Sequence, residues 1–164
     1  MPLGDQTPPL AFVQHLDGLD VRRGQVAQRA PHPNGVYEMD RIYIVGPDVE
    51  AMVAQYRQAF GGAEPARDRG ILIKADMAAF AFAQSQLLVV QPNGPGPAAD
   101  ALLARGPGVF QVIHRVKNIG DTGNYLTARG ITPAVGGRRS TGEMALVVGA
   151  ADALGCNMGF VGPE

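Results

Sequence analysis

The chain has 164 residues, 46% of them hydrophobic, which is enough for one domain with a sizeable core and excludes a disordered chain. The formal net charge of -1 gives no electrostatic reason to expect nucleic acid or an anionic membrane as a partner. The single cysteine, Cys156, excludes an internal disulfide and favours a cytoplasmic location. Neither a signal peptide nor a membrane-spanning stretch is predicted.

Residues 1–38 are predicted to form an N-terminal arm ahead of the main domain. Within it, Leu10–Leu16 alternates as a strand does, and the Pro-Asn-Gly sequence at 33–35 is typical of a tight turn. We expect this arm to add an extra edge strand that packs on the core or on a partner subunit. Residues 39–164 are predicted to form a single domain.

The stretch from Asp40 to Gly61 predicts a strand, a tight turn and an amphipathic helix. Ile42–Val45 is a short apolar run, and Asp48 stands where a helix N-cap belongs. Apolar residues then recur at three- and four-residue spacing, as on one buried helix face: Val49, Met52, Val53, Tyr56 and Phe60. The two glycines at 61 and 62 follow where this helix should end.

The rest of the first half is predicted to supply strands. We expect a polar connection at 63–70, a short strand at Ile71–Lys74, and two further strands at Met77–Ala83 and Gln86–Gln91. The Pro- and Gly-rich residues 92–97 end this half as a linker, and a short helix is predicted at Ala98–Ala104.

The second half repeats the order of the first. A strand is predicted at Val109–Val116, a helix at Asn118–Arg129 and a second strand at Ile131–Val135. A loop at 136–142 follows, and two final strands are predicted at Met144–Val148 and Cys156–Val161. Each half therefore contains one strand, one helix and two or three further strands.

Over residues 40–162 the sequence resembles the vicinal-oxygen-chelate superfamily of glyoxalases, bleomycin-resistance proteins and dioxygenases. The residues that fit the opening of that family's pattern are Asp40, Ile42, Ile44, Asp48, Val49, Tyr56 and Gly61. Three later segments are also similar: QLLVVQP, GPGVFQVIHRV and EMALVVGAADALGCNMGF. The resemblance implies an α+β fold in which two βαβββ modules, 40–92 and 108–162, curl one mixed sheet into a half-open cup.

The resemblance also locates the four positions that bind a divalent metal in the family. Here they carry Arg41, Leu88, Gln111 and Gly159. Arg stays protonated, and Leu and Gly have no donor atom, so only Gln111 could contribute a ligand. We therefore expect neither a metal nor another cofactor. An alternative is an unusual site or a general base at His15 or His32, if the arm folds over the mouth of the cup.

Strand alternation assigns the side chains that face the inside of the cup. They are Arg41, Tyr43, Leu88, Val90, Gln111, Ile113, Arg115 and Asn157. We expect no acid on this inner face, and guanidinium forks match carboxylate or phosphate, so the predicted ligand is apolar with an anionic or carbonyl end. The alternative is that Arg41 and Arg115 pair with neighbouring carboxylates such as Asp40 or Glu38.

Three other features have a structural and a functional interpretation. His114 is predicted to face the helices as a core residue, and Cys156 to be a small buried side chain. The Gly-rich segment GGRRSTG at 136–142 is either a solvated hairpin loop or a lid that carries Arg138 and Arg139 at the rim of the cup.

Three functional hypotheses follow. The first is a metal-independent isomerase- or lyase-type enzyme, in which Arg41 holds an enolate or carboxylate and Tyr43 is the nearest acid or base. The second is a non-catalytic ligand-binding protein of the bleomycin-resistance type, and the third is a structural member without a ligand. A homodimer is expected in each case, because open sheet edges and apolar rims need a cover.

Overall fold

The computed structural model describes residues 21, 24 and 30–164. The strand predicted at Leu10–Leu16, and His15 within it, lie outside the described residues. Among the described residues, no helix is both long enough and apolar enough to cross a membrane.

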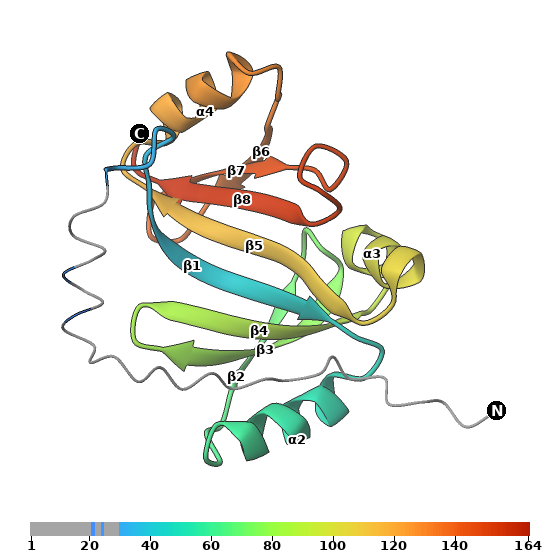
Figure 1. Cartoon of the computed structure of the whole chain (residues 1–164). Helices are drawn as coiled ribbons and strands as arrows, with labels where there is room; N and C mark the ends of the chain where they lie inside the picture. Colours follow the sequence, from blue (N-terminus) through green and yellow to red (C-terminus); the bar gives the residue numbers. More distant parts are fainter. Residues whose placement is uncertain (1–20, 22–23, 25–29) are drawn as a thin grey trace.

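Two copies of the same element order, joined by a helix, make up the fold (Figure 1). The first copy consists of β1 (Val36–Val45), α2 (Val49–Ala59), β2 (Ala66–Gly70), β3 (Ala75–Phe82) and β4 (Ser85–Pro92). Helix α3 (Pro97–Arg105) is the connection. The second copy consists of β5 (Gly108–Val116), α4 (Ile119–Thr127), β6 (Ala134–Arg138), β7 (Met144–Val148) and β8 (Asn157–Gly162).

All the strands belong to one eight-stranded mixed sheet, in the order β2-β3-β4-β1-β5-β8-β7-β6. Within each copy the first strand pairs with the last in parallel, β1 with β4 and β5 with β8. The two first strands, β1 and β5, pair antiparallel at the centre of the sheet. The predicted fold of two βαβββ modules in one curled sheet is therefore confirmed.

Each module helix begins at the predicted cap. The Asp48 carboxylate accepts hydrogen bonds from the backbone N–H groups of Glu50 and Ala51, at 2.9 and 3.0 Å, and so satisfies donors that a helix start leaves free. In the second module the Asn118 side chain accepts from the N–H of Asp121 at 2.9 Å. Both helices then bury their apolar faces against the sheet.

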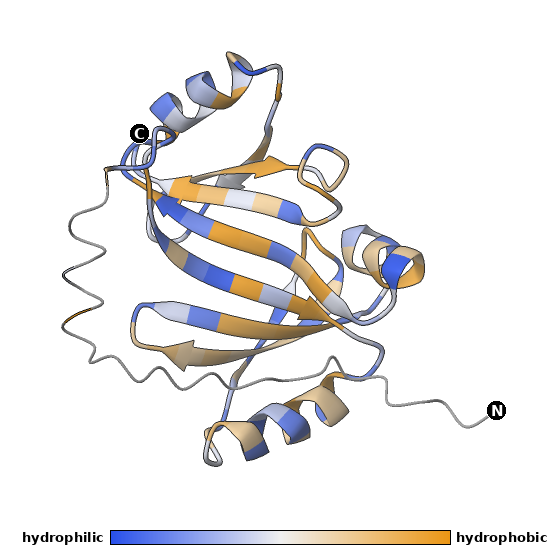
Figure 2. Ribbon diagram, in the orientation of Figure 1, coloured by the Kyte–Doolittle hydropathy of each residue, from blue (hydrophilic) through white to orange (hydrophobic). Residues whose placement is uncertain are grey.

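The two faces of the sheet carry different helices. Helix α2 packs on the face that presents Ile42, Ile44 and Val89, and α4 packs on Val116 and Phe160 of the same side. The intervening positions, Tyr43, Val45, Leu88 and Val90, belong to a cluster on the opposite, concave face, where α3 covers one end. Along β1 and β5, hydrophilic residues interrupt the hydrophobic ones (Figure 2).

Several element boundaries differ from the sequence prediction. The segment predicted as a polar connection at 63–70 contains the edge strand β2, and the predicted strand Ile71–Lys74 is the turn that follows it. Strand β2 consists of the polar residues ARDRG, so its backbone pairing with β3 and not an apolar pattern makes it a strand. Strand β1 starts six residues before Ile42 because its pairing with β5 continues to Val36 and Val116.

Candidate functional site

A β-bulge at the centre of the sheet aims Asp40 at its neighbour. Strand β1 pairs Met39 with His114 and Arg41 with Ile113, so Asp40 is an extra residue between two successive pairs. Strict alternation would place Asp40 and Arg41 on opposite faces, whereas a bulge locally changes the direction of a side chain. The Asp40 side chain is only 2% exposed, and its Oδ2 accepts from Arg41 Nε at 2.6 Å.

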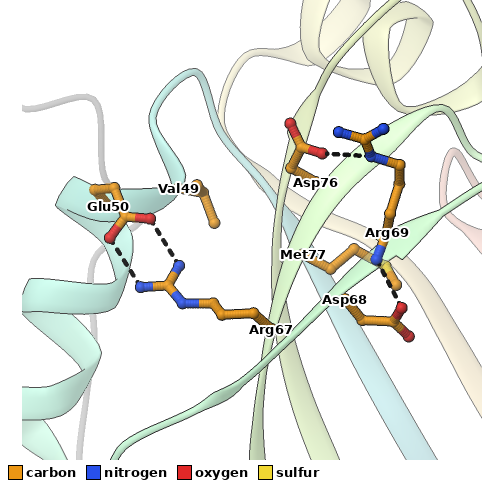
Figure 3. Close-up of a pocket in the computed structure, with 7 residues that line it drawn as sticks. All are labelled: Val49, Glu50, Arg67, Asp68, Arg69, Asp76 and Met77. Carbon is orange, nitrogen blue, oxygen red and sulfur yellow. Dashed lines mark hydrogen bonds and ion pairs between the residues drawn. The ribbon is translucent and has the colours of Figure 1, made fainter.

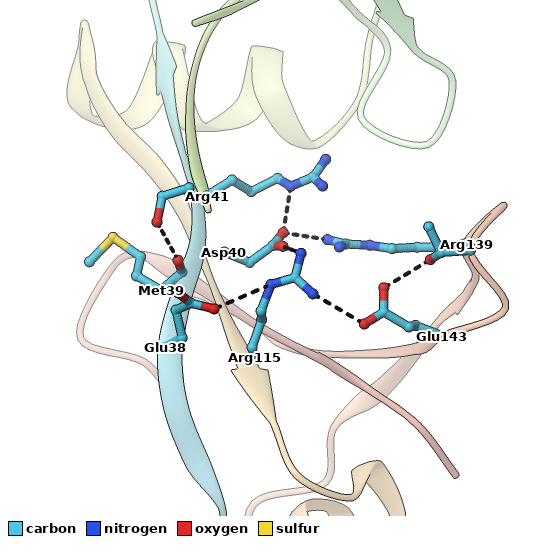
Figure 4. Close-up of polar contacts among 9 residues, drawn as sticks. Glu38, Met39, Asp40, Arg41, Arg115, Arg139 and Glu143 are labelled. Atoms are coloured by element: carbon cyan, nitrogen blue, oxygen red, sulfur yellow. Dashed lines mark hydrogen bonds and ion pairs between the residues drawn. The ribbon is translucent and has the colours of Figure 1, made fainter. Parts of the chain in front are cut away.

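Three guanidinium groups converge on the Asp40 carboxylate (Figure 4). Besides Arg41 on β1, Arg139 from the loop after β6 donates from Nη2 to Oδ2 at 2.9 Å. Arg115 on β5 forms an ion pair from Nη2 to Oδ1 at 2.6 Å. These residues come from both modules, so the cluster joins the central strands to the β6–β7 loop.

The cations around Asp40 determine its ionisation. Burial acts to raise the pKa of Asp40, but the hydrogen bonds and charges of Arg139 and Arg41 outweigh it, and the pKa lies below the ordinary value. Burial likewise acts to lower the pKa of Arg41, but Tyr43 and Asp40 outweigh it and raise that pKa. Asp40 is therefore a carboxylate and Arg41 a guanidinium cation at neutral pH, which makes Asp40 unsuited as a general base.

Arg115 has two further acidic partners. Its Nε lies 3.8 Å from Glu38 Oε2, and its Nη1 lies 3.3 Å from Glu143 Oε1. The expectation that the inner face has no acid is thus wrong, because the bulge turns Asp40 inward and the β6–β7 loop supplies Glu143. For both Arg41 and Arg115, the structure shows the pairing with carboxylates that the sequence left as an alternative.

The strand register gathers the residues assigned to the cup on the four central strands. Tyr43 lies beside Leu88 on β4 and Gln111 on β5. Gln111 in turn lies beside Asn157 on β8. The Tyr43 phenol is close enough to Arg41 to favour its charged form, and the Tyr43 ring meets Phe110 edge to face at 6.4 Å. Tyr43, Gln111 and Arg41 therefore form one polar patch on the concave face.

Leu88 and Val90 have a different environment from that patch. They are 3% and 0% exposed and pack in the apolar cluster with Ala98 and Ala101 of helix α3. Ile113 and Asn157 are half-buried. The apolar end of the concave face is therefore core covered by α3, and the polar patch lies beyond it.

The residues at the family's metal positions do not fit a divalent ion. Arg41 is a cation held by Asp40, and Leu88 is packed in the core. At Gly159 there is no side chain, and an added Cβ would lie 2.9 Å from Ile113 Cγ1, so a ligand side chain there would have to displace Ile113. Among the described residues, no three His, Cys, Asp or Glu side chains are grouped to hold a metal ion.

His32, His114 and Cys156 take no part in the polar patch. His114 stacks near Phe160 on the helix side, with ring centroids 6.2 Å apart. Burial lowers the pKa of His114, and His32 lowers it further. The turn that contains His32 lies against α4 on the helix side, because the Asn34 carbonyl accepts a hydrogen bond from Thr122 Oγ1 at 2.8 Å. Burial raises the pKa of the Cys156 thiol, although Arg105 acts against it, so this thiol is a poor nucleophile.

A cavity of about 550 Å³ lies elsewhere, between the start of α2 and the edge strand β2 (Figure 3). Two ion pairs flank it. Arg67 donates both terminal nitrogens to Glu50 at 2.8 Å, and Arg69 Nε donates to Asp76 at 3.1 Å. Each arginine is thus neutralised by a carboxylate of the cavity wall, and no residue of the polar patch lines this cavity.

Sequence reasoning missed the role of two residues in this site. Alternation turns Asp40 away from the cup, so the sequence indicates it only as an alternative partner for arginine. The sequence indicates Arg139 only as part of a hairpin loop or lid. A signal was present for Asp40, since an acid directly before an inward-facing arginine can share its face wherever a bulge occurs.

Comparisons with known proteins give the fold. No protein-family model matches the sequence, and neither does any curated protein. Among solved structures, methylmalonyl-CoA epimerase from Mycobacterium tuberculosis is similar with a TM-score of 0.70 and 20% identity, covering 84% of this chain and 95% of that one. A Streptomyces coelicolor methylmalonyl-CoA epimerase variant in complex with 2-nitronate-propionyl-CoA has a TM-score of 0.66 and 17% identity over 79% and 99% of the two chains.

A hypothetical protein from Bacillus halodurans is also similar, with a TM-score of 0.66, 15% identity, and coverage of 77% of this chain and 94% of that one. These likenesses show that the chain has the vicinal-oxygen-chelate fold that its sequence resembles.

Proposed function

We propose that the protein is an isomerase-type enzyme that moves a proton on a carbon next to a carbonyl group, without a metal. The observation that carries this proposal is Arg41, a cation at the position of the family's first metal ligand. Its guanidinium is oriented by Asp40 at 2.6 Å and is accompanied by Tyr43. Its charge replaces part of what a metal would supply to a developing enolate. The shared fold with the epimerases supports an isomerase rather than a lyase.

In this proposal Arg41 binds the carbonyl oxygen of the substrate. When the adjacent carbon loses its proton, negative charge develops on that oxygen, and a fixed guanidinium stabilises the charge without reorganising. Asp40 is a positioning residue, because it contacts Arg41 and not the substrate. The half-buried side chains of Ile113 and Asn157 provide further contact surface on neighbouring strands.

Tyr43 is the proposed proton carrier. The nearby carboxylates Glu38, Asp40 and Glu143 are all engaged with Arg115. Within the described residues, Tyr43 is therefore the acid or base beside Arg41 that takes part in no salt bridge. In its phenolate form Tyr43 would accept the C–H proton and become a phenol, and that phenol would return the proton to the planar enolate carbon.

Solvent deuterium exchange tests the proposal. The protein is incubated in D₂O with methylmalonyl-CoA and with the monomethyl ester of methylmalonate, and loss of the C2 proton is followed by NMR. We expect exchange above the protein-free rate, and a loss of at least about 100-fold in Arg41→Met and Tyr43→Phe. The control is Arg57→Met, which removes an exposed arginine paired with Glu64 on the helix side.

A second candidate function is a ligand-binding protein without chemistry. The salt bridges of Arg115 with Glu38, Asp40 and Glu143 favour it, because they occupy the carboxylates that could act as a base and leave only Tyr43 beside Arg41 among the described residues. In that case NMR would show saturable binding of the monoester that depends on Arg41, with no exchange in the wild type. Exchange that persists in Arg41→Met would instead contradict the role of Arg41 in either function.

A further inference from the structure

We propose that Arg139, held beside Arg41 by Asp40, completes a carboxylate-binding subsite on the concave face, next to the nitrogen of Arg41 that binds the carbonyl oxygen. The substrate would then carry a carboxylate in addition to its carbonyl group. This inference rests on the proposed function and adds a specificity-determining residue, Arg139, that comes from the β6–β7 loop.

One oxygen of Asp40 holds both guanidinium groups in place. Arg41 donates to Oδ2 from Nε at 2.6 Å, and Arg139 donates to the same atom from Nη2 at 2.9 Å. Two donors to one oxygen must lie close together, so the guanidinium groups are neighbours (Figure 4). Their side chains are 25% and 20% exposed, so each keeps some surface in contact with solvent while Asp40 holds one of its nitrogens.

The three carboxylates of the cluster all contact Arg115, and only one of them contacts Arg41 and Arg139. Arg115 faces Asp40 Oδ1, Glu38 and Glu143. Arg41 and Arg139 share Oδ2, and in the described part of the chain neither contacts a second carboxylate. A guanidinium offers five N–H donors, and the Asp40 contact uses one nitrogen of each. A carboxylate can use the others, because its two oxygens match the spacing of guanidinium donors.

The β6–β7 turn presents Arg139 to the site and turns its neighbour away. The turn closes through the Arg139 N–H donating to the Glu143 carbonyl at 2.8 Å and the Gly142 N–H donating to the Arg139 carbonyl at 2.9 Å. Arg138, the preceding residue, donates instead to Glu164 at 2.6 Å and is 53% exposed. Two adjacent residues, Arg138 at the end of β6 and Arg139 in the loop, therefore give one arginine at the subsite and one matched arginine outside it.

A pair of small probes tests the subsite. The monomethyl ester of methylmalonate has a carbonyl and a carboxylate, whereas the dimethyl ester has no charge. Binding is measured by NMR titration of the full chain. We expect the monoester to bind at least about tenfold more tightly than the diester. Arg139→Met should remove this preference, and Arg138→Met should keep it. Arg139→Lys should keep part of it, because lysine retains the positive charge but lacks the paired N–H donors of the guanidinium group.

The outcomes separate this inference from the proposed function. If binding depends on Arg41 but Arg139→Met leaves the preference for the monoester intact, the subsite is wrong and the proposed function stands. If Arg41→Met does not weaken either probe, both fail. Circular dichroism of each variant checks folding, and Arg139→Lys, which keeps a cation next to Asp40, provides the comparison should Arg139→Met unfold.

Discussion

Asp40 in β1 and Arg139 in the β6–β7 loop are 99 residues apart in the sequence and are joined by a 2.9 Å hydrogen bond. Asp40 is 2% exposed, and Arg139 is one of three cations that contact it. This buried carboxylate therefore links β1 to β5 and to the β6–β7 loop, and its loss should lower the stability of the fold.

We predict that Asp40→Asn lowers the free energy of unfolding by roughly 3 to 5 kcal/mol, because three guanidinium groups lose the charge that compensates them. Urea unfolding of the variant and the wild type measures the difference. The matched control is Glu164→Gln, which breaks an exposed pair with Arg138 and should cost less than about 1 kcal/mol. Equal losses in the two variants would mean that the Asp40 cluster is not buried in solution.

Acid stability should depend on the same carboxylate. The pKa of Asp40 is lowered in the folded protein from the ordinary value of 3.8, so the unfolded chain takes up this proton first as pH falls. The contribution of Asp40 is complete above the ordinary pKa and is lost progressively below it, towards the folded pKa. Urea unfolding at about pH 6 and about pH 3 should therefore show a smaller pH-dependent loss in Asp40→Asn than in the wild type. An unchanged loss would contradict the lowered pKa.

The two arginines of the central strands should differ in their effect on stability. Arg115 contacts three carboxylates, whereas Arg41 contacts only Asp40. When Arg41 is replaced, Asp40 still has Arg115 and Arg139 as partners. We expect Arg115→Met to reduce the free energy of unfolding by roughly 2 to 4 kcal/mol and Arg41→Met by about 1 to 2 kcal/mol. Thermal and urea unfolding rank the two variants. A larger loss of unfolding free energy in Arg41→Met than in Arg115→Met would show that Arg41 has a mainly structural role.

Tyr56 offers a stabilising substitution. Its hydroxyl is buried beneath α2 with no hydrogen-bond partner among the described residues, and burial raises the pKa of Tyr56. Phe keeps the ring contacts with Phe60 and Phe80 and removes the unsatisfied hydroxyl. We predict that Tyr56→Phe is neutral or raises the free energy of unfolding by up to about 1 kcal/mol. A clear destabilisation in urea would reveal a partner for the hydroxyl.

A homodimer remains a prediction, and the helix side of the sheet is where we expect the partner to bind. Val109 and Met158 are 47% and 36% exposed there, on strands whose neighbouring positions are core. Light scattering at micromolar concentration should give the mass of two chains, and Met158→Glu should give that of one. Leu103→Glu on α3, where Leu103 is 90% exposed, is the control and should leave the dimer intact. A monomeric wild type would contradict the prediction.

The sequence by itself determined the module plan, because that plan depends on short-range patterns. The cap at Asp48 and the apolar spacing of α2 are local, and the second module repeats them from Asn118 onward. The misfit to a metal was also readable, since Arg41, Leu88 and Gly159 lack ligand atoms whatever their surroundings. The strand β2 was missed because its residues are polar and its pairing with β3 decides its conformation.

Only the tertiary structure decided how the arginines of the concave face are used. The direction of Asp40 depends on a bulge, and a bulge exists only in the pairing of β1 with β5. The position of Arg139 depends on a hairpin turn that brings it to a residue 99 positions away. Charges attract through space and not along the chain, so the partners of Arg41, Arg115 and Arg139 are set by the folded sheet and not by the order of residues.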